Sequence, residues 1–393
     1  MRHGNIAPFL VWLIGTSITE VASISSPNLP IATTRHDTLK DYNTNLRPEE
    51  HTVINVTMVL TSLNKLDVSS QILQTTFLLH LSWIDERLTW TPTNTSSPDY
   101  IIFYAKEIWT PPLVVNNAID DAISILKEEI VPMRVSNRGN VLWIPRLSPT
   151  TTCSVDISYF PYDIQHCHIN ITSWTHANFE VELNPVETAY YTNKVYLGFY
   201  PDDKEWFLQR YGVSKQDIIG GHGFDYTNLQ YSFVFERHHP FYKAMLIVPF
   251  AVLSLCLCFT HVIPLKSGEK ISFAITTMVA FQLYQVMLSE LLPPIAEFTE
   301  TYTFGKYLMC VWIHAAIVTI GTAVQLRAFY WEEEDPPKDP PKDKKKTTRV
   351  KVLKILDCVG FILSFVYWFI ITTYFLTTLT KGTDKELPAN VDL

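Results

Sequence analysis

Four long apolar segments in the second half of the chain restrict its fold more than any other feature. Each has 18 to 21 residues without Asp, Glu, Lys or Arg; they are Ala244–Val262, Ile271–Leu288, Tyr307–Leu326 and Val359–Leu379. A helix rises about 1.5 Å per residue, so each segment is long enough to cross a bilayer. Buried helices of a soluble protein are the alternative, which the repeated uncharged length disfavours. We therefore expect a four-helix transmembrane bundle.

The first part of the chain has the features of a secreted β domain. Residues 1–23 combine a basic start, a short apolar stretch and small residues, which is typical of a signal peptide; a membrane anchor is the alternative. Residues 24–239 alternate apolar and polar side chains between turn signals, which predicts an extracellular immunoglobulin-like β-sandwich. A short helix is expected at Thr38–Asn45, and the expected strands include Val53–Thr61, Gln71–Trp83, Arg134–Ser136, Val141–Ile144 and Tyr226–Phe235.

Glycosylation sequons and net charge agree with export. Asn55, Asn94 and Asn170 each begin an Asn-x-Ser/Thr sequon, so they are predicted glycosylation sites. The net charge of −8 disfavours a nucleic-acid partner.

The charges of the connections predict the membrane orientation. The first connection contains Lys266 and Lys270, whereas the second carries Glu290, Glu297 and Glu300. Lysine-rich connections stay in the cytoplasm, so both termini of a plasma-membrane protein would be extracellular. The expected domains after the sandwich are transmembrane helices one to three within 240–326, a short, proline-rich cytoplasmic linker at 327–354, helix four at 355–380 and an extracellular tail at 381–393.

The second apolar segment has a graded stripe at helical spacing. Its residues are polar at one end, apolar in the middle and acidic at the other, and they are Ser272, Thr276, Val279, Leu283, Val286 and Glu290, preceded by Glu269. A helix that lines a water-filled pore needs hydroxyls to solvate ions and carboxylates to attract cations. Several copies would have to surround the pore. The alternative is that Ser272 and Thr276 hydrogen-bond neighbouring helices.

Cys153 and Cys167 are the only cysteines in the polar first part of the chain, and thirteen residues separate them. In an oxidising compartment such a pair should form a disulfide, which would stabilise the fold by about 3 kcal/mol. Phe160, Pro161, Tyr162 and Asp163 lie in the middle of this loop. By spacing alone the pair predicts only a stabilising disulfide in a secreted domain.

Several motifs in order give the chain a family resemblance. Beyond the cysteine loop they are Trp109-x-Pro111, Thr172-Ser173-Trp174, Arg237, Ser267-Gly268-Glu269-Lys270, Glu290 with Pro293, and Gly305-Lys306-Tyr307. From Thr38 to Leu379 the chain resembles the Cys-loop pentameric ligand-gated ion channels, most closely the cationic nicotinic acetylcholine and serotonin type-three branch.

This resemblance implies a mechanism. Five subunits, identical or mixed, would form a symmetric pentamer around a central pore, with a small-molecule extracellular agonist bound between subunits. Glu269 matches the position that favours cations, and Val279 matches the hydrophobic gate. The permeant ions would be monovalent cations, with calcium as a further candidate, and membrane lipids would surround the helices. Phe160 to Asp163, with Arg237 nearby, would press on the connection at Pro294–Glu297 and so couple binding to opening.

The resemblance also assigns the agonist site. Trp174 and Tyr226 match its aromatic residues, Phe224 and His222 align less firmly, and aromatic faces there bind cationic amines. On the complementary side the matching positions hold Leu78, His80 and Asn116. Leu78 stands where relatives have an aromatic residue, and the loop before Phe224 lacks an adjacent cysteine pair. These departures argue against a simple acetylcholine or serotonin site.

Other functions remain open from the sequence. The same channel fold could be gated by protons or a divalent metal through His80, His222, His238 and His239, although ordinary surface histidines are the simpler interpretation. It could also be an auxiliary subunit that needs a partner, or a non-conducting surface receptor. The sequence shows no Gly-rich phosphate loop, metal-spaced His/Cys cluster or nucleophile motif, so no enzyme, cofactor or metal is expected. The cysteines in or beside the apolar segments are expected to be buried thiols: Cys256, Cys258, Cys310 and Cys358.

Overall fold

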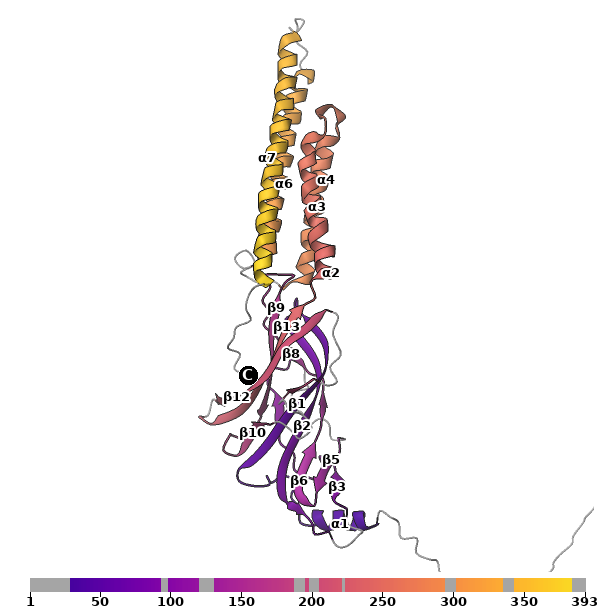
Figure 1. Cartoon of the computed structure of the whole chain (residues 1–393), viewed down its shortest axis with the longest axis vertical. Helices are drawn as coiled ribbons and strands as arrows, with labels where there is room; N and C mark the ends of the chain where they lie inside the picture. The colour runs from indigo at the N-terminus through magenta and orange to yellow at the C-terminus, as the bar shows by residue number, and fades with distance from the viewer. Residues whose placement is uncertain are drawn as a thin grey trace, which may run out of the picture.

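The computed structural model describes residues 29–92, 98–119, 131–186, 195–197, 205–220, 223–293, 302–334 and 343–383. Over these residues the molecule is elongated, with β-sheets followed by a bundle of long helices (Figure 1). The predicted order of a β domain and four apolar helices is therefore confirmed. Several predictions lie outside the described residues: the signal peptide, Asn94, His222, the connection Pro294–Glu297 with Glu300, and most of the tail at 381–393.

One sheet contains nine strands among the described residues. Its order is β10-β1-β2-β6-β5-β3, with β11 paired to β1 and both β7 and β8 paired to β2. The long antiparallel pair β1 and β2 forms its centre. The bounds are β1 Thr52–Asp67, β2 Ile72–Thr89, β3 Tyr100–Phe103, β5 Met133–Ser136, β6 Arg138–Trp143, β7 Arg146–Leu147, β8 Thr150–Thr152, β10 Val181–Pro185 and β11 Val195–Tyr196.

The second sheet is antiparallel, in the order β12-β13-β9-β4. Its strands are β4 Leu113–Val115, β9 Ile164–Ser173, β12 Trp206–Ile219 and β13 Asp225–Arg237. Phe77 and Trp143 of the first sheet share one buried core with Tyr231 and Phe233 of the second. Inner faces packed in this way make a β-sandwich, as predicted.

The predicted disulfide is confirmed. Cys153, just after β8, is bonded to Cys167 of β9, and both residues are buried in the core of the sandwich. The bond therefore joins a strand of the second sheet to a segment that leaves the first.

The predicted short helix at Thr38–Asn45 is wrong. The helix in this region, α1, is Leu29–Leu39. The backbone N–H of Asn45 donates to Oδ1 of Asn43 at 2.9 Å, which closes a turn instead. Asparagine side chains compete with helical hydrogen bonds in this way.

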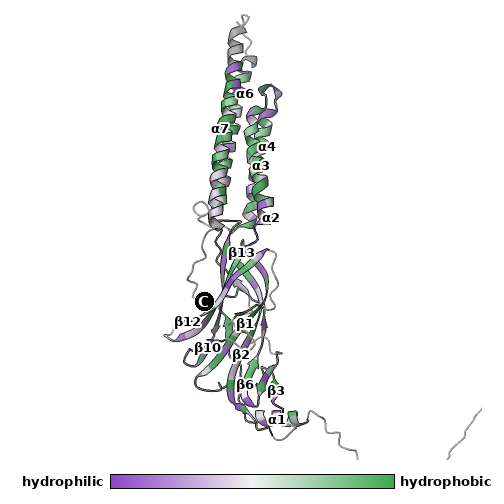
Figure 2. Ribbon diagram, in the orientation of Figure 1, coloured by the Kyte–Doolittle hydropathy of each residue, from purple (hydrophilic) through white to green (hydrophobic). Residues whose placement is uncertain are grey.

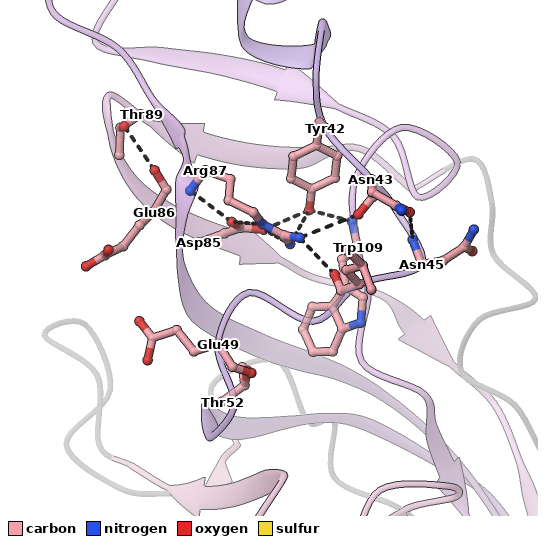
Figure 3. A network of polar contacts seen from close by, with 11 residues as sticks. Tyr42, Asn43, Asn45, Glu49, Thr52, Asp85, Glu86, Arg87, Thr89 and Trp109 are labelled. Atoms are coloured by element: carbon pink, nitrogen blue, oxygen red, sulfur yellow. Dashed lines mark hydrogen bonds and ion pairs between the residues drawn. The ribbon is translucent and has the colours of Figure 1, made fainter.

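A polar network attaches the segment after α1 to the first sheet (Figure 3). The buried carboxylate of Asp85 accepts hydrogen bonds from the Tyr42 hydroxyl at 2.7 Å and from Arg87 at 2.7 and 2.8 Å. The Tyr42 hydroxyl accepts in turn from the Trp109 N–H at 3.0 Å. Because a buried carboxylate without partners is costly, this network holds Trp109 and the first sheet in one arrangement.

The first apolar segment is built from several short helical pieces. They are α2 Pro240–Tyr242, the π-helix η3 Lys243–Ile247, α3 Val248–Cys258 and the 3₁₀ helix η4 Phe259–Val262. Pro249 has no backbone N–H to donate, which explains why the wide π turn directly precedes α3. The short 3₁₀ helix η5, Leu265–Ser267, then leads to the next long helix.

The remaining helices are α4 Glu269–Leu291, α6 Thr303–Glu334 and α7 Asp343–Thr383. Both α6 and α7 continue into the region 327–354, which the sequence predicted as a linker. Its described residues, 327–334 and 343–354, are helical, because Glu and Lys are good helix formers and extend the apolar helices at little cost.

The long helices are built mostly of apolar residues, drawn in green in Figure 2. In the most apolar 18-residue stretch of α7 only 6 % of the residues are buried. In the matching stretch of the first apolar segment, Pro240–Val262, 39 % are buried. Cys358 of α7 is also exposed, not buried as the sequence predicted. Four helices in the described chain are long and apolar enough to cross a membrane. Exposed apolar surface on this scale requires lipid or other subunits around it, so the chain is a multi-pass membrane protein with α7 at the edge of the bundle.

Candidate functional site

Arg237, the last residue of β13, is the centre of a buried charge cluster where the sandwich meets the helices. It donates to the two carboxylate oxygens of Asp163 at 2.8 and 3.0 Å, and to Glu205 at 3.2 Å. Its guanidinium carbon lies 4.2 Å from the ring centroid of Trp206. Burial acts to lower the pKa of Arg237, but the adjacent carboxylates of Asp163 and Glu205 raise it above its ordinary value. The cation is therefore permanent. The sequence analysis expected Arg237 near the tip of the cysteine loop, and the structure pairs it with Asp163.

The tip of the cysteine loop contacts the start of the helices. The buried ring of Phe160 packs edge-on against Tyr242 of α2, with the centroids 5.7 Å apart. The ring of Tyr162 lies 4.6 Å from that of His239. Pro161 between them is also buried. The loop predicted to couple the two parts thus packs directly on the chain that enters the membrane.

A main-chain hydrogen bond crosses the same junction. The backbone N–H of Thr303, the first residue of α6, donates to the carbonyl of Ser158 at 3.1 Å. No side-chain pattern identifies a main-chain contact of this kind, and the sequence analysis missed it.

Three exposed aromatic side chains gather around the end of β9. Trp174 follows β9 with 62 % of its surface exposed, and its N–H donates to the carbonyl of Pro112 at 2.9 Å. The register of β9 with β13, continued two residues, sets Trp174 opposite Tyr226. The exposed ring of Phe224 lies 6.0 Å from that of Phe179, which is exposed as well. The sequence predicted Trp174, Tyr226 and Phe224 for this site but missed Phe179.

Gly220 allows the backbone to lie close to the ring of Tyr226 at this site. A Cβ at Gly220 would lie 2.4 Å from the ring of Tyr226, so a larger residue would displace the tyrosine. The N–H of Gly220 donates to the carbonyl of Phe224 at 2.8 Å, which ties the residue after β12 to the residue before β13.

The residues predicted for the complementary side lie elsewhere on the sandwich. Leu78 and His80 are half-buried on β2 of the first sheet, and Asn116 is exposed in the turn after β4. Burial lowers the pKa of His80, so its imidazole is neutral at physiological pH. A site shared between neighbouring subunits takes its two halves from two different places on each subunit. The separation of these residues from the aromatic residues meets this requirement.

The predicted stripe of α4 lies on the exposed face of the single chain. All seven residues are exposed: Glu269, Ser272, Thr276, Val279, Leu283, Val286 and Glu290. The middle three are apolar and have half or more of their surface exposed, at 50 to 66 %. The hydroxyl of Thr276 donates to the carbonyl of Ser272, so it does not need a neighbouring helix as acceptor.

The opposite face of α4 is anchored in the bundle. Lys270 is completely buried, and its ammonium forms an ion pair with Asp357 of α7. Thr277 and Phe281 on this face are also buried. The anchored face points the stripe away from the other helices of the same chain.

The comparison with known proteins decides the family. Residues 32–239, more than half of the chain, match the family model described as the neurotransmitter-gated ion-channel ligand binding domain. The chain belongs to the neurotransmitter-gated ion channels. This confirms the resemblance recognised in the sequence.

The relatives of this channel-family chain are acetylcholine receptor subunits. It is 27 % identical over 334 residues to the neuronal acetylcholine receptor subunit alpha-9 of Gallus gallus, which covers 83 % of this chain and 66 % of the relative. It is 28 % identical to the alpha-9 subunit of Homo sapiens, over 74 % of this chain and 59 % of the relative. For the beta-4 subunit of Homo sapiens the identity is 27 %, over 68 % and 52 %. The chain thus spans just under two thirds, or less, of these relatives.

Two predicted glycosylation sites of this channel-family chain lie within strands. Asn55 is half-buried on β1 and accepts a hydrogen bond from Asn184 at 3.3 Å. Asn170 is half-buried on β9, between β13 and β4. Glycosylation at both positions stays a prediction.

Proposed function

We propose that this chain is a subunit of a pentameric, cation-selective channel that a small extracellular ligand opens. The observation that carries the proposal is the junction between the sandwich and the helices. There the cysteine loop packs on Tyr242 through Phe160 and pairs with Arg237 through Asp163. Movement in the sandwich therefore has a direct contact through which to act on the helices.

The face of α4 supplies the pore in this proposal. Exposed carboxylates at Glu269 and Glu290 would concentrate cations at the two mouths, and the apolar residues between them would close the pore by dewetting. Monovalent cations are the expected permeant ions, with calcium as a further candidate. With the lysine-rich connections in the cytoplasm, the sandwich and both termini would lie outside the cell.

The exposed aromatic residues supply one half of the ligand site. Trp174, Phe179 and Phe224 present faces that attract an organic cation, an interaction of about 2 kcal/mol when desolvated. Leu78, His80 and Asn116 would contribute the other half from a neighbouring subunit, identical or different. Since the relatives are named acetylcholine receptor subunits, a cationic amine is the ligand class we favour.

Gating by protons or a metal is less well supported. Burial lowers the pKa of His80, so it stays neutral to a lower pH than an ordinary histidine does. Among the residues that the structure describes, no group of three His, Cys, Asp or Glu side chains could hold a metal ion.

Expression of the chain in oocytes tests this function. Amines, amino acids, acid pH and zinc are applied to the chain alone and with a relative's subunit, and reversal potentials are measured in salt gradients. The proposal expects amine-evoked currents that reverse with the cation gradient. Glu269→Ala and Glu290→Lys should lower conductance several-fold, whereas the outward-facing Ile370→Ser on α7 should not. Currents that follow chloride, or a conductance that neither acidic substitution changes, would contradict it.

A further inference from the structure

Two histidines on the outer face of the second sheet have no part in the proposed function. His166 and His168 belong to β9, where they alternate with the buried residues Gln165, Cys167 and Ile169. Side chains alternate between the two faces of a strand, so both imidazoles project from the side of the sheet that faces away from the core. Each histidine is half-buried, so each keeps part of its surface in contact with solvent.

The two imidazoles are neighbours on this face. Successive residues on one face of a strand are roughly 7 Å apart, and two nitrogens bound to one zinc ion are at most about 4 Å apart. Rotation of the two side chains toward each other closes this difference. Burial lowers the pKa of His168, and the neighbouring His166 lowers it further. The imidazole of His168 is therefore neutral at physiological pH, which is the form that binds metals.

Ser232 of β13 orients one of the two rings. Nδ1 of His168 lies 3.0 Å from Oγ of Ser232, which is its partner in the register of β9 with β13. When Nδ1–H donates to this hydroxyl, Nε2 carries the lone pair, as it does in a histidine that binds a metal. The side-chain amide of Asn117 donates to the carbonyl of His168 at 2.8 Å, so the backbone is held as well. The ring of His168 is thus oriented before an ion arrives.

The donor atoms select the class of ion. Neutral imidazole is a good ligand for zinc, whereas calcium and magnesium prefer oxygen ligands. Two imidazoles leave the other positions of a tetrahedral zinc ion to water. Such a site has fewer protein ligands than the group of three His, Cys, Asp or Glu side chains that the described residues lack. It therefore suits reversible binding rather than a permanent structural ion.

Asn170 lies two residues further along the same face of β9. Its predicted glycan would require this face to stay open to solvent in the pentamer. The same opening would let an ion from the extracellular solution reach the two histidines.

We propose that His166 and His168 form an extracellular zinc site on the outer face of the sandwich. Nε2 of His168 and a ring nitrogen of His166 bind the ion, and Ser232 positions His168. The two histidines flank Cys167, which the disulfide joins to Cys153 at the start of the cysteine loop. A bound ion therefore restrains β9 next to the point where that loop is attached. Zinc binding itself rests on neither the proposed ligand nor conduction.

Titration calorimetry of the purified full chain with zinc chloride tests the proposal. We expect saturable binding that calcium does not compete for. His166→Gln and His168→Gln should each weaken it by at least about tenfold, and Ser232→Ala by about tenfold, because the ring of His168 loses its orienting partner. Zinc should also raise the melting temperature of wild type more than that of His168→Gln.

His51→Ala is the matched control for these variants. His51 is an exposed histidine whose Nε2 lies 3.3 Å from the carboxylate of Glu182, so this variant measures zinc held by an ordinary surface histidine. Its affinity should equal that of wild type. Wild-type affinity in both glutamine variants, or an equal loss in His51→Ala, would overturn the site. Unchanged affinity in Ser232→Ala would overturn the assignment of Nε2. No current enters these measurements, so failure of the zinc site is distinguishable from failure of the proposed channel function.

Discussion

At the scale of single residues, the role of Arg237 depends on the planar geometry of its guanidinium and not on its charge alone. Its planar guanidinium engages both oxygens of Asp163 while lying over Trp206. A lysine keeps the charge but cannot supply paired donors. Arg237→Lys should therefore retain radioligand binding while lowering the maximal agonist-evoked current by about tenfold, which corresponds to roughly 1.4 kcal/mol. Arg138→Lys, at an exposed position of β6, is the control. A maximal current equal to wild type would show that the paired geometry does not matter.

Tyr42 gives the sandwich a dependence on alkaline pH. Burial raises the pKa of Tyr42, and the neighbouring Asp85 raises it further, because a phenolate beside a carboxylate is unfavourable. A raised folded pKa contributes stability that is complete below about pH 10, the unfolded value, and is lost as the pH rises through the folded pKa. Tyr42→Phe should lower the melting temperature at neutral pH, since it loses hydrogen bonds worth about 1 kcal/mol.

The test of this prediction is a series of thermal unfolding curves of the solubilised full chain. The melting temperature of wild type should fall more steeply above about pH 10 than that of Tyr42→Phe. Tyr104→Phe, at an exposed tyrosine, should behave as wild type does. Parallel curves for wild type and Tyr42→Phe would exclude Tyr42 as the titrating group.

At the scale of elements, α4 has two faces with different tasks. Val279, Leu283 and Val286 form the apolar part of the exposed stripe. A serine at Val279 would wet this part and favour the conducting state. Val279→Ser should lower the agonist concentration for half-maximal current by at least about fivefold, as measured by dose–response recording. Ile370→Ser, on the outer side of α7, should leave this concentration unchanged. An unchanged or higher half-maximal concentration for Val279→Ser would show that Val279 is not the gate.

The anchored face of α4 depends on the pair of Lys270 and Asp357. Removing one partner leaves a buried charge uncompensated, at a cost of about 3–5 kcal/mol, whereas replacing both by apolar residues can be neutral. Asp357→Asn should therefore reduce the fraction that assembles, measured by size-exclusion chromatography of the solubilised protein. The double variant Lys270→Met/Asp357→Leu should recover most of it. If Asp357→Asn assembles like wild type, the ion pair is not what anchors α4.

Sequence reasoning succeeded where a residue's role follows from its own chemistry. The apolar helices and the disulfide were both predicted, and Arg237 was expected near the cysteine loop. It failed where partners lie far apart in the chain. Asp357 lies 87 residues from Lys270, and Phe179 approaches Phe224 only because two loops fold together.

At the scale of the whole molecule, the described contacts between the sandwich and the bundle include Phe160 with Tyr242 and Tyr162 with His239. Tyr162 is half-buried in that contact, where its ring packs on His239. Tyr162→Ala should leave ligand affinity within about twofold of wild type and reduce the maximal current several-fold, because the sandwich stays folded while its contact weakens. Binding and current recorded on the same cells check this, with the exposed Tyr100→Ala as control. A parallel loss of affinity and current would indicate misfolding rather than uncoupling.

The hydrogen bond between Ser158 and Thr303 has a consequence for how such a receptor can diverge. Both partners are main-chain atoms, so nearly every substitution at either position preserves the bond, and only a proline at Thr303 removes its donor. Side chains around the junction can therefore change to suit new ligands or membranes while this attachment is inherited intact. Mutational scanning of side chains would overlook it, although it ties the extracellular part to the start of a membrane helix.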